Sequence, residues 1–190
     1  MKKRIILAVL TSGMIILLSL TIKAYKKWNR YVIEAGTNSS MTISEPLSDL
    51  DRIEFSFRTN PTWYYNHLET PVWNKIRGIS NGEYRKNSSA HLAYQCVNDS
   101  LLVVGACCIV DGVGPQENDS QQIILDTIDA NGEYTCRILR EDGKYKFYFE
   151  DKYWDCPAGE EQEWGYIVNP HVDPDFTLDH DWMVDLLDLR

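Results

Sequence analysis

The chain has 190 residues and a formal net charge of −9, from 28 Asp and Glu against 19 Lys and Arg. Seven of the basic residues and none of the acidic ones lie in residues 1–30, so residues 31–190 hold 12 basic and 28 acidic residues, a net charge of −16. A field of this sign repels phosphate backbones and argues against nucleic acid as a partner. The length suits one domain of ordinary size.

An apolar run from Ile5 to Ile22 contains no charged residue. A helix of this length spans roughly 27 Å, close to the ~30 Å hydrocarbon core of a bilayer. The sequence Ile22-Lys23-Ala24 lacks the small residues of a cleavage site, which favours an uncleaved signal anchor over a cleaved signal. We therefore predict one transmembrane helix in residues 1–30, with the membrane as partner through residues 5–22. Basic residues flank both sides of the run, but the short basic N-terminal tail favours an extracytoplasmic domain.

Residues 31–49 are polar, and their run "GTNSSMTISEP" has no period, so we predict a tether there and a domain over residues 50–190. Within the domain, apolar and polar residues alternate as they do in strands with one buried face. The alternating apolar residues of "RIEFSFR", "EYTCRILR" and "KYKFYFE" are Ile53, Phe55, Phe57, Tyr134, Cys136, Ile138, Tyr145, Phe147 and Phe149.

The turns between the later runs indicate hairpins. Asn131-Gly132 and Asp142-Gly143 are dipeptides that tolerate the positive φ angles of tight turns. We predict that residues 121–128, 133–140 and 144–150 form a three-stranded meander.

The run "LLVVGACCIV", Leu101 to Val110, is apolar on both faces and predicts a central strand covered on both sides. Residues 50–170 show no long helical period, so the covering layer is most simply a second sheet. The C-terminal "DWMVDLLDL" suits a strand or a helix, and we favour the strand. The predicted fold is an all-β, antiparallel, jelly-roll-like β-sandwich after one N-terminal transmembrane helix.

Three motifs resemble those of a family of small bacterial β-sandwich domains without an assigned function. They are "WNKIRGIS" at Trp73–Ser80, "NSSAHLAYQC" at Asn87–Cys96 and "GYIVNP" at Gly165–Pro170, and His180-Asp181 fits the family's closing His-Asp. The resemblance runs from Trp73 to the end of the chain. It implies a single-domain sandwich with a C-terminal strand, and it implies no reaction. The segment "PHVDP" and His91 depart from the family pattern, so a role of that region in relatives does not transfer.

A row of aromatic residues is the first candidate binding surface. Trp63, Tyr64 and Tyr65 are consecutive, so on a strand or loop at least one ring is expected outside. Exposed rings beside Asn66 would stack on sugars or anchor a protein partner.

Asn74 and Lys75 are further candidate ligand contacts, because they lie between Trp73 and Ile76 in the first family motif. A structural role, with Trp73 in the core and Asn74 holding a turn, is the favoured interpretation.

The segment "HVDPDFTLDHDW" raises the question of a metal, since it holds two histidines and four aspartates. In an extended segment, alternate side chains lie about 6.6–7 Å apart, which lets two of them reach one ion but seldom three. Calcium is usually bound by more oxygen ligands than this segment offers, and zinc by more His or Cys ligands. We favour a solvated acidic loop and predict no cofactor. The candidate metal ligands are His171, Asp173, Asp175, Asp179 and Asp181.

The five cysteines cannot all pair within one chain. Cys107 and Cys108 face opposite sides of one predicted strand, so at most one of them shares a layer with Cys96 or Cys136. Cys156 is predicted to lie in a loop. Buried free thiols are favoured over one or more disulfides.

The sequence contains no Gly-x-Ser-x-Gly, phosphate-loop, His-Glu-x-x-His or Cys-x-x-Cys motif, which argues against an enzyme. His91 and Cys96 are predicted on opposite faces of one strand, which argues against a thiol-imidazole pair. We predict a non-enzymatic binding or interaction module of the cell envelope, with a glycan or an envelope protein as partner. The alternatives are an envelope glycan hydrolase that uses carboxylates at Asp173–Asp181, and a cytoplasmic-facing subunit of a membrane complex, whose thiols would be reduced.

Overall fold

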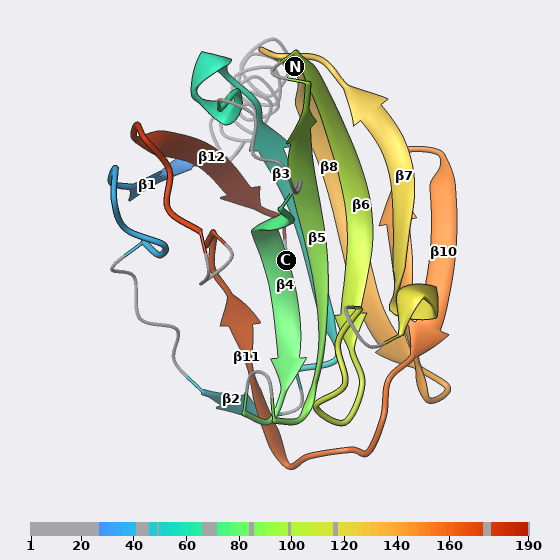
Figure 1. Ribbon diagram of the computed structural model, residues 1–190. Helices are drawn as coiled ribbons and strands as arrows, with labels where there is room; N and C mark the ends of the chain where they lie inside the picture. The colour runs from blue at the N-terminus through green and yellow to red at the C-terminus, as the bar shows by residue number, and fades with distance from the viewer. Residues whose placement is uncertain are drawn as a thin grey trace, which may run out of the picture.

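The structure is a computed structural model that describes residues 27–40, 46–48, 50–65, 72–83, 86–98, 100–115, 118–172 and 176–189. These residues form an all-β antiparallel sandwich of jelly-roll-like form, with six strands in each of two sheets (Figure 1). None of the helices within those ranges is long and apolar enough to span a bilayer. The anchor predicted at residues 5–22 lies outside them.

The first sheet has the strand order β1-β12-β3-β8-β9-β10. Its strands are β1 (Asn29–Ile33), β12 (Trp182–Asp188), β3 (Arg52–Arg58), β8 (Glu133–Glu141), β9 (Lys144–Phe149) and β10 (Lys152–Pro157). The second sheet has the order β2-β11-β4-β5-β6-β7. Its strands are β2 (Leu47–Ser48), β11 (Trp164–Val168), β4 (Asn74–Asn81), β5 (Ser88–Val97), β6 (Leu101–Ile109) and β7 (Gln122–Ile128). Two short 3-10 helices, η1 and η2, cover Pro61–Trp63 and Asp119–Gln121.

The core lies between the sheets and is built from the predicted period-two faces. Ile53, Phe55 and Phe57 of β3 are buried, and Tyr145, Phe147 and Phe149 of β9 lie on the same inward face of that sheet. The predicted central strand is β6, which lies between β5 and β7 and is buried on both faces. The ambiguous C-terminal segment is the strand β12, as predicted.

The predicted meander is only partly right. Strands β8 and β9 pair across a tight turn at Asp142-Gly143, where φ is 54° and 70°. Strand β7, in contrast, belongs to the second sheet and pairs with β6. The turn before β8 crosses between the sheets, held by Thr59, whose hydroxyl donates to Asp129 O at 2.7 Å. The neighbour of β8 on its other side is β3, all of whose residues pair with β8.

The stretch predicted as a tether contributes two edge strands. Strand β1 pairs with β12 over five positions, and β2 pairs with β11 at two. Among the described residues, strands of the sandwich therefore already occur from Asn29, ahead of the start expected near Leu50. Strands this short leave too few alternating residues to be recognised in a polar sequence.

One disulfide, Cys108–Cys156, joins β6 of the second sheet to β10 of the first. Buried free thiols were favoured over a disulfide, and Cys156 was expected in a loop; both expectations are wrong for Cys108 and Cys156. Here Cys156 lies in β10 with its side chain turned into the core, opposite the inward face of β6. Cys96, Cys107 and Cys136 are buried free thiols, as expected.

Arg77 of β4 links the two sheets at their edge. Its side chain is only 4% exposed, and its guanidinium donates two hydrogen bonds of 2.8 Å to the carboxylate of Asp188 at the end of β12. It also donates to the Oδ1 of Asn169 and, at 3.3 Å, to the hydroxyl of Tyr31 in β1.

We expect Asp188→Ala to lower the free energy of unfolding by about 2 kcal/mol, because it leaves a buried guanidinium without its counter-ion. Asp188 is 44% exposed, so solvent reduces the effect below that of a fully buried pair. Arg77→Met, which removes the charge and keeps much of the volume, should cost less. Urea unfolding of both variants checks this, and equal losses would contradict the role given to the unpaired charge.

Candidate ligand-binding face

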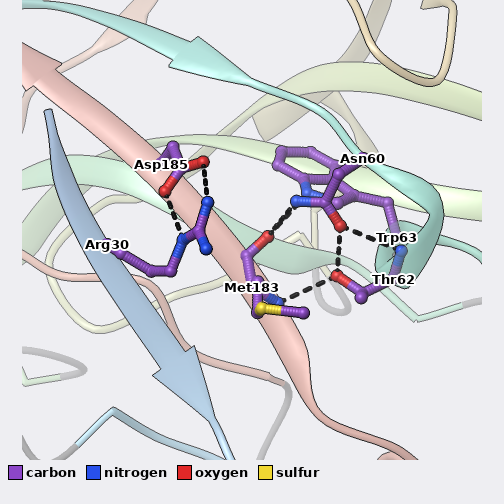
Figure 2. Close-up of polar contacts among 6 residues, drawn as sticks. All are labelled: Arg30, Asn60, Thr62, Trp63, Met183 and Asp185. Carbon is purple, nitrogen blue, oxygen red and sulfur yellow. Dashed lines mark hydrogen bonds and ion pairs between the residues drawn. The ribbon is translucent and has the colours of Figure 1, made fainter.

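Trp63, which was predicted to lie in an exposed aromatic surface, is placed in the core by a short helical turn. Pro61 begins η1, and the side chain of Asn60 caps it by accepting from Thr62 N at 2.9 Å. This turn carries Trp63 into the core with no exposed surface, and its indole donates to Met183 O at 2.9 Å (Figure 2). Asn60 donates to the same carbonyl, so β12 fixes the whole turn.

The neighbours of Trp63 divide between core and surface. Tyr65 is 4% exposed, and its hydroxyl accepts from Cys96 N at 3.1 Å. Burial raises the pKa of Tyr65 to about 12. Tyr64 is half-buried, so it alone of the three rings meets the expectation of a ring outside. Asn66 lies outside the described residues.

The predicted metal ligands do not converge where they are described. His171 holds Asn169 O through Nδ1 at 3.0 Å, Asp179 contacts His180 at 2.6 Å, and Asp181 accepts from Ala35 N at 2.9 Å. Asp173 and Asp175 lie outside the described residues. Within the described ranges, no group of three or more His, Cys, Asp or Glu could hold a metal ion.

The outer face of the second sheet, which points away from the core, carries polar side chains at one end of β5. Strand β5 turns Ala90, Leu92 and Cys96 inward, so the alternate residues Ser89 and His91 point outward. His91 and Cys96 are thus on opposite faces, as expected.

Two glycines make room for rings on this face. A Cβ on Gly78 would lie 2.6 Å from His91 Nδ1, and one on Gly105 would lie 2.5 Å from the indole of Trp73. The rings of His91 and Trp73 therefore lie against β4 and β6. Trp73 covers the outer face of the sheet. The prediction that it lies in the core is wrong.

Two residues singled out in the sequence meet on this face. The backbones of Lys75 and His171 exchange hydrogen bonds of 2.8 and 3.0 Å. The imidazole of His171 lies edge-on to that of His91, with ring centroids 6.3 Å apart. Asn74 instead points into the core from the first position of β4 and is fully buried, so it does not hold a turn as expected.

Two reactive groups on this face are closed off from solvent. His91 Nε2 lies 2.8 Å from the hydroxyl of Ser89, the arrangement of a base and a nucleophile. Both side chains are at most 1% exposed, so a substrate does not reach them in this structure. Burial raises the pKa of Cys107 to about 12, although Lys75 acts in the opposite direction, so the thiol is protonated and unreactive at neutral pH.

One accessible part of this face is a pair of aromatic rings on β11. Trp164 and Tyr166 are two residues apart, so both project from the same side of the strand. Their ring centroids are 6.3 Å apart and their planes differ by 21°. Trp164 is 43% exposed, and Tyr166 is half-buried opposite Ser80 of β4. We refer to Trp164 and Tyr166 as the aromatic platform.

Trp164 and Tyr166 are not among the residues predicted to bind a ligand. The signal for the platform is present in "EWGYIV", where the aromatic residues alternate with Gly165 and Ile167. The alternation places Trp164 and Tyr166 on one face, but it does not tell which face is open to solvent.

The fold has counterparts among solved structures. The marine PL7 alginate lyase AlyA1 from Zobellia galactanivorans matches with a TM-score of 0.55 at 8% identity, over 85% of this chain and 75% of that chain. The two proteins share a fold. The alginate lyase from Alteromonas sp. 272 matches with a TM-score of 0.45 at 10% identity, over 72% of this chain and 69% of that chain. Toad ovary galectin, in complex with thio-digalactose, matches with a TM-score of 0.41 at 8% identity, over 75% of this chain and 98% of that chain. No family model and no curated protein matches the sequence.

Proposed function

We propose that this chain is a non-enzymatic glycan-binding module of the cell envelope, and that the aromatic platform is its contact surface. The observation that carries the proposal is the pair of exposed Trp164 and half-buried Tyr166, whose ring planes are nearly parallel, on the outer face of the second sheet. Aromatic rings offer a large apolar contact area with few rotatable bonds, and they dominate the energetics of the surfaces they occupy.

The rings and the fold support a glycan as the ligand. Tyr166 lies opposite Ser80, and Ser80 lies opposite Ser89, but both hydroxyl groups are at most 1% exposed, so the rings themselves are the contact surface. An apolar aromatic surface matches the apolar face of a sugar ring. The fold shared with an alginate lyase, an enzyme that acts on a polysaccharide, supports the same ligand class.

We place the module outside the cytoplasm. The Cys108–Cys156 disulfide supports this location, because such bonds persist in oxidising compartments, and it weighs against a cytoplasmic-facing subunit with reduced thiols. The predicted signal anchor at residues 5–22 supports it as well. A hydrolase built on Asp179 and Asp181 has weaker support, because both carboxylates bind neighbouring groups of the chain itself.

We expect Trp164→Ala to weaken binding to the recognised glycan about 30-fold, the effect of losing about 2 kcal/mol at a central contact. Tyr166→Ala should act in the same direction. The measurement is a glycan-array screen of the folded domain, followed by titration of the best binder against each variant.

Tyr153→Ala is the matched control, because Tyr153 is 54% exposed but lies on β10 of the other sheet. It should leave the affinity unchanged within about twofold. Unchanged binding of every detected glycan by Trp164→Ala and Tyr166→Ala would refute the proposal.

A further inference from the structure

Four asparagines of the chain lie in the sequence Asn-x-Ser/Thr, with x other than Pro, which is the acceptor sequence for N-linked glycans. Each is followed two positions later by Ser, and they are Asn38, Asn87, Asn98 and Asn118. Asn60 has Thr62 at that position, but the intervening Pro61 excludes it. A sequence this short also occurs by chance, so accessibility in the folded domain is what distinguishes the four positions.

Two of the four asparagines are held by neighbouring parts of the chain. Asn87 is half-buried, its side chain accepts from Glu83 N at 2.9 Å, and a Cβ on Gly82 would lie 2.7 Å from its Oδ1. Asn38 is half-buried as well, and its carbonyl accepts from Val172 N at 2.8 Å. These surroundings leave less room for a bulky oligosaccharide than an exposed turn does.

The other two asparagines, Asn98 and Asn118, are exposed. Asn98 has a φ of 51° in the turn between β5 and β6, and Ser100 follows it there, also exposed. Asn118 precedes η2, and its Oδ1 accepts from the backbone N and the hydroxyl of Ser120 at 3.1 and 2.7 Å. The amide oxygen of Asn118 is thus turned toward the chain, which leaves Nδ2, the atom that a glycan joins, on the other side of the amide.

Both exposed positions flank an apolar edge of the sandwich. Asn98 precedes β6 at the end of the sheet where β7 finishes, and Asn118 precedes the start of β7 (Figure 1). Strand β7 is an edge strand, and its seven residues include no Lys, Arg or Pro. Four exposed large hydrophobic side chains lie on β6, on β7 or in the loop between them: Leu101, Val113, Ile123 and Ile124. Proteins usually charge or cover such an edge, because it pairs with other chains.

We propose that Asn98 and Asn118 carry N-linked glycans, which cover this edge. In the modification, Nδ2 of the asparagine forms a bond to C1 of an oligosaccharide that is donated as its polyprenyl pyrophosphate ester. The bond between C1 and the pyrophosphate oxygen breaks, Nδ2 loses one proton, and the polyprenyl pyrophosphate leaves.

This inference rests on the location outside the cytoplasm that is part of the proposed function, which the Cys108–Cys156 disulfide supports. It does not rest on the aromatic platform. The platform lies on β11, which β4, β5 and β6 separate from β7, so glycans along the β7 edge leave the rings of the platform open.

The test uses the full-length chain, expressed with a C-terminal affinity tag in the cells that naturally produce it. Enzymatic release of N-linked glycans in heavy-oxygen water converts each modified Asn to a labelled Asp, which peptide mass spectrometry locates. We expect the label at Asn98 and Asn118, and none at Asn38 or Asn87.

Substitution of the serines separates the acceptor sequence from a structural role of the asparagines. Ser100→Ala and Ser120→Ala should each abolish the label at the asparagine two positions before, although that asparagine is still present. The matched controls Ser100→Thr and Ser120→Thr keep the acceptor sequence and should keep the label. A label that survives the Ala substitutions would show that the modification does not use these sequences, and would overturn the proposal.

Sedimentation velocity tests whether the glycans cover the edge. The associated fraction of Ser100→Ala/Ser120→Ala should exceed that of Ser100→Thr/Ser120→Thr at least about twofold, because the apolar edge is then open. Adding Ile124→Lys, which places a charge on the edge, should restore the monomer. Equal association of the Ala and Thr double variants would overturn the covering role.

The outcomes separate this inference from the proposed function. Unlabelled Asn98 and Asn118 in a protein whose Cys108–Cys156 bond has formed overturn the glycan sites and leave the location and the platform in place. Unlabelled sites together with reduced Cys108 and Cys156 overturn the location as well. A label at Asn38 or Asn87 alone overturns the assignment by accessibility.

Discussion

Reduction of the Cys108–Cys156 disulfide is expected to lower the free energy of unfolding by about 4 kcal/mol. The bond closes a loop with a sequence separation of 48 residues, and the loss follows from the conformational freedom that such a loop regains in the unfolded chain. It also joins the two sheets through β6 and β10, so its removal frees β10, an edge strand of the first sheet. Denaturant unfolding with and without a thiol reductant measures the effect.

The variant Cys108→Ala/Cys156→Ala separates the bond from other effects of the reductant. It should unfold near the midpoint of the reduced natural protein, and reductant should not shift that midpoint further. Cys96, Cys107 and Cys136 are already free thiols, so they contribute nothing to the difference. A midpoint of the natural protein that does not respond to reductant would refute a disulfide contribution.

Trp63→Ala is expected to cost about 3–5 kcal/mol, the range for removing a large aromatic side chain from a packed core. Three aromatic rings surround that of Trp63. The distances between ring centroids are 4.5 Å to Tyr94, 5.6 Å to Trp182 and 5.7 Å to Phe57. Its loss opens a cavity between the sheets and leaves Met183 O with one donor fewer.

The adjacent residue provides the control for this prediction. Tyr64 is half-buried, so Tyr64→Ala should cost less than about 1 kcal/mol. Urea unfolding followed by far-UV circular dichroism compares the two variants. A Trp63→Ala domain as stable as Tyr64→Ala would place the indole outside the core, contrary to the structure. If Trp63→Ala is destabilised as expected, any ligand-binding defect of this variant is a consequence of unfolding.

Side-chain alternation predicted which residues face the core but not which strands pair. The inward faces of β3 and β9 follow directly from the positions of Phe55, Phe57 and Phe147, because a strand with one buried face repeats every two residues. The partner of β7 does not follow, because period two is the same whether a strand continues a meander or crosses to the other sheet. That choice depends on contacts between distant residues, such as Thr59 with the turn before β8.

The position of Trp63 had a local signal that the row of aromatic residues concealed. Asn60-Pro61-Thr62 combines a helix-capping residue with a proline at the first helical position. The 3-10 turn over Pro61–Trp63 ends with the indole of Trp63 facing the core. The backbone is extended at Tyr64, so side chains alternate from there, which brings Tyr65 inward while Tyr64 remains at the surface.

The aromatic platform was harder to predict because its exposure depends on the edge of the sheet. Strand β11 has β4 on one side and only the two-residue strand β2 on the other. A ring on that strand stays accessible because no long neighbour covers it. Sequence periodicity assigns Trp164 to a face, but the length of a neighbouring strand is a property of the assembled sheet.

The register of β6 against β5 determines which of its two adjacent cysteines can form a disulfide with Cys156. Cys108 points inward toward Cys156, and Cys107 points outward. A shift of β6 by one position would exchange their roles and turn the apolar face of the strand outward. A bond between Cys107 and Cys156 would then lock the misaligned strand in place. Correct folding in an oxidising compartment thus requires β6 to align with β5 before its thiols are oxidised, or an isomerase that reopens the wrong bond.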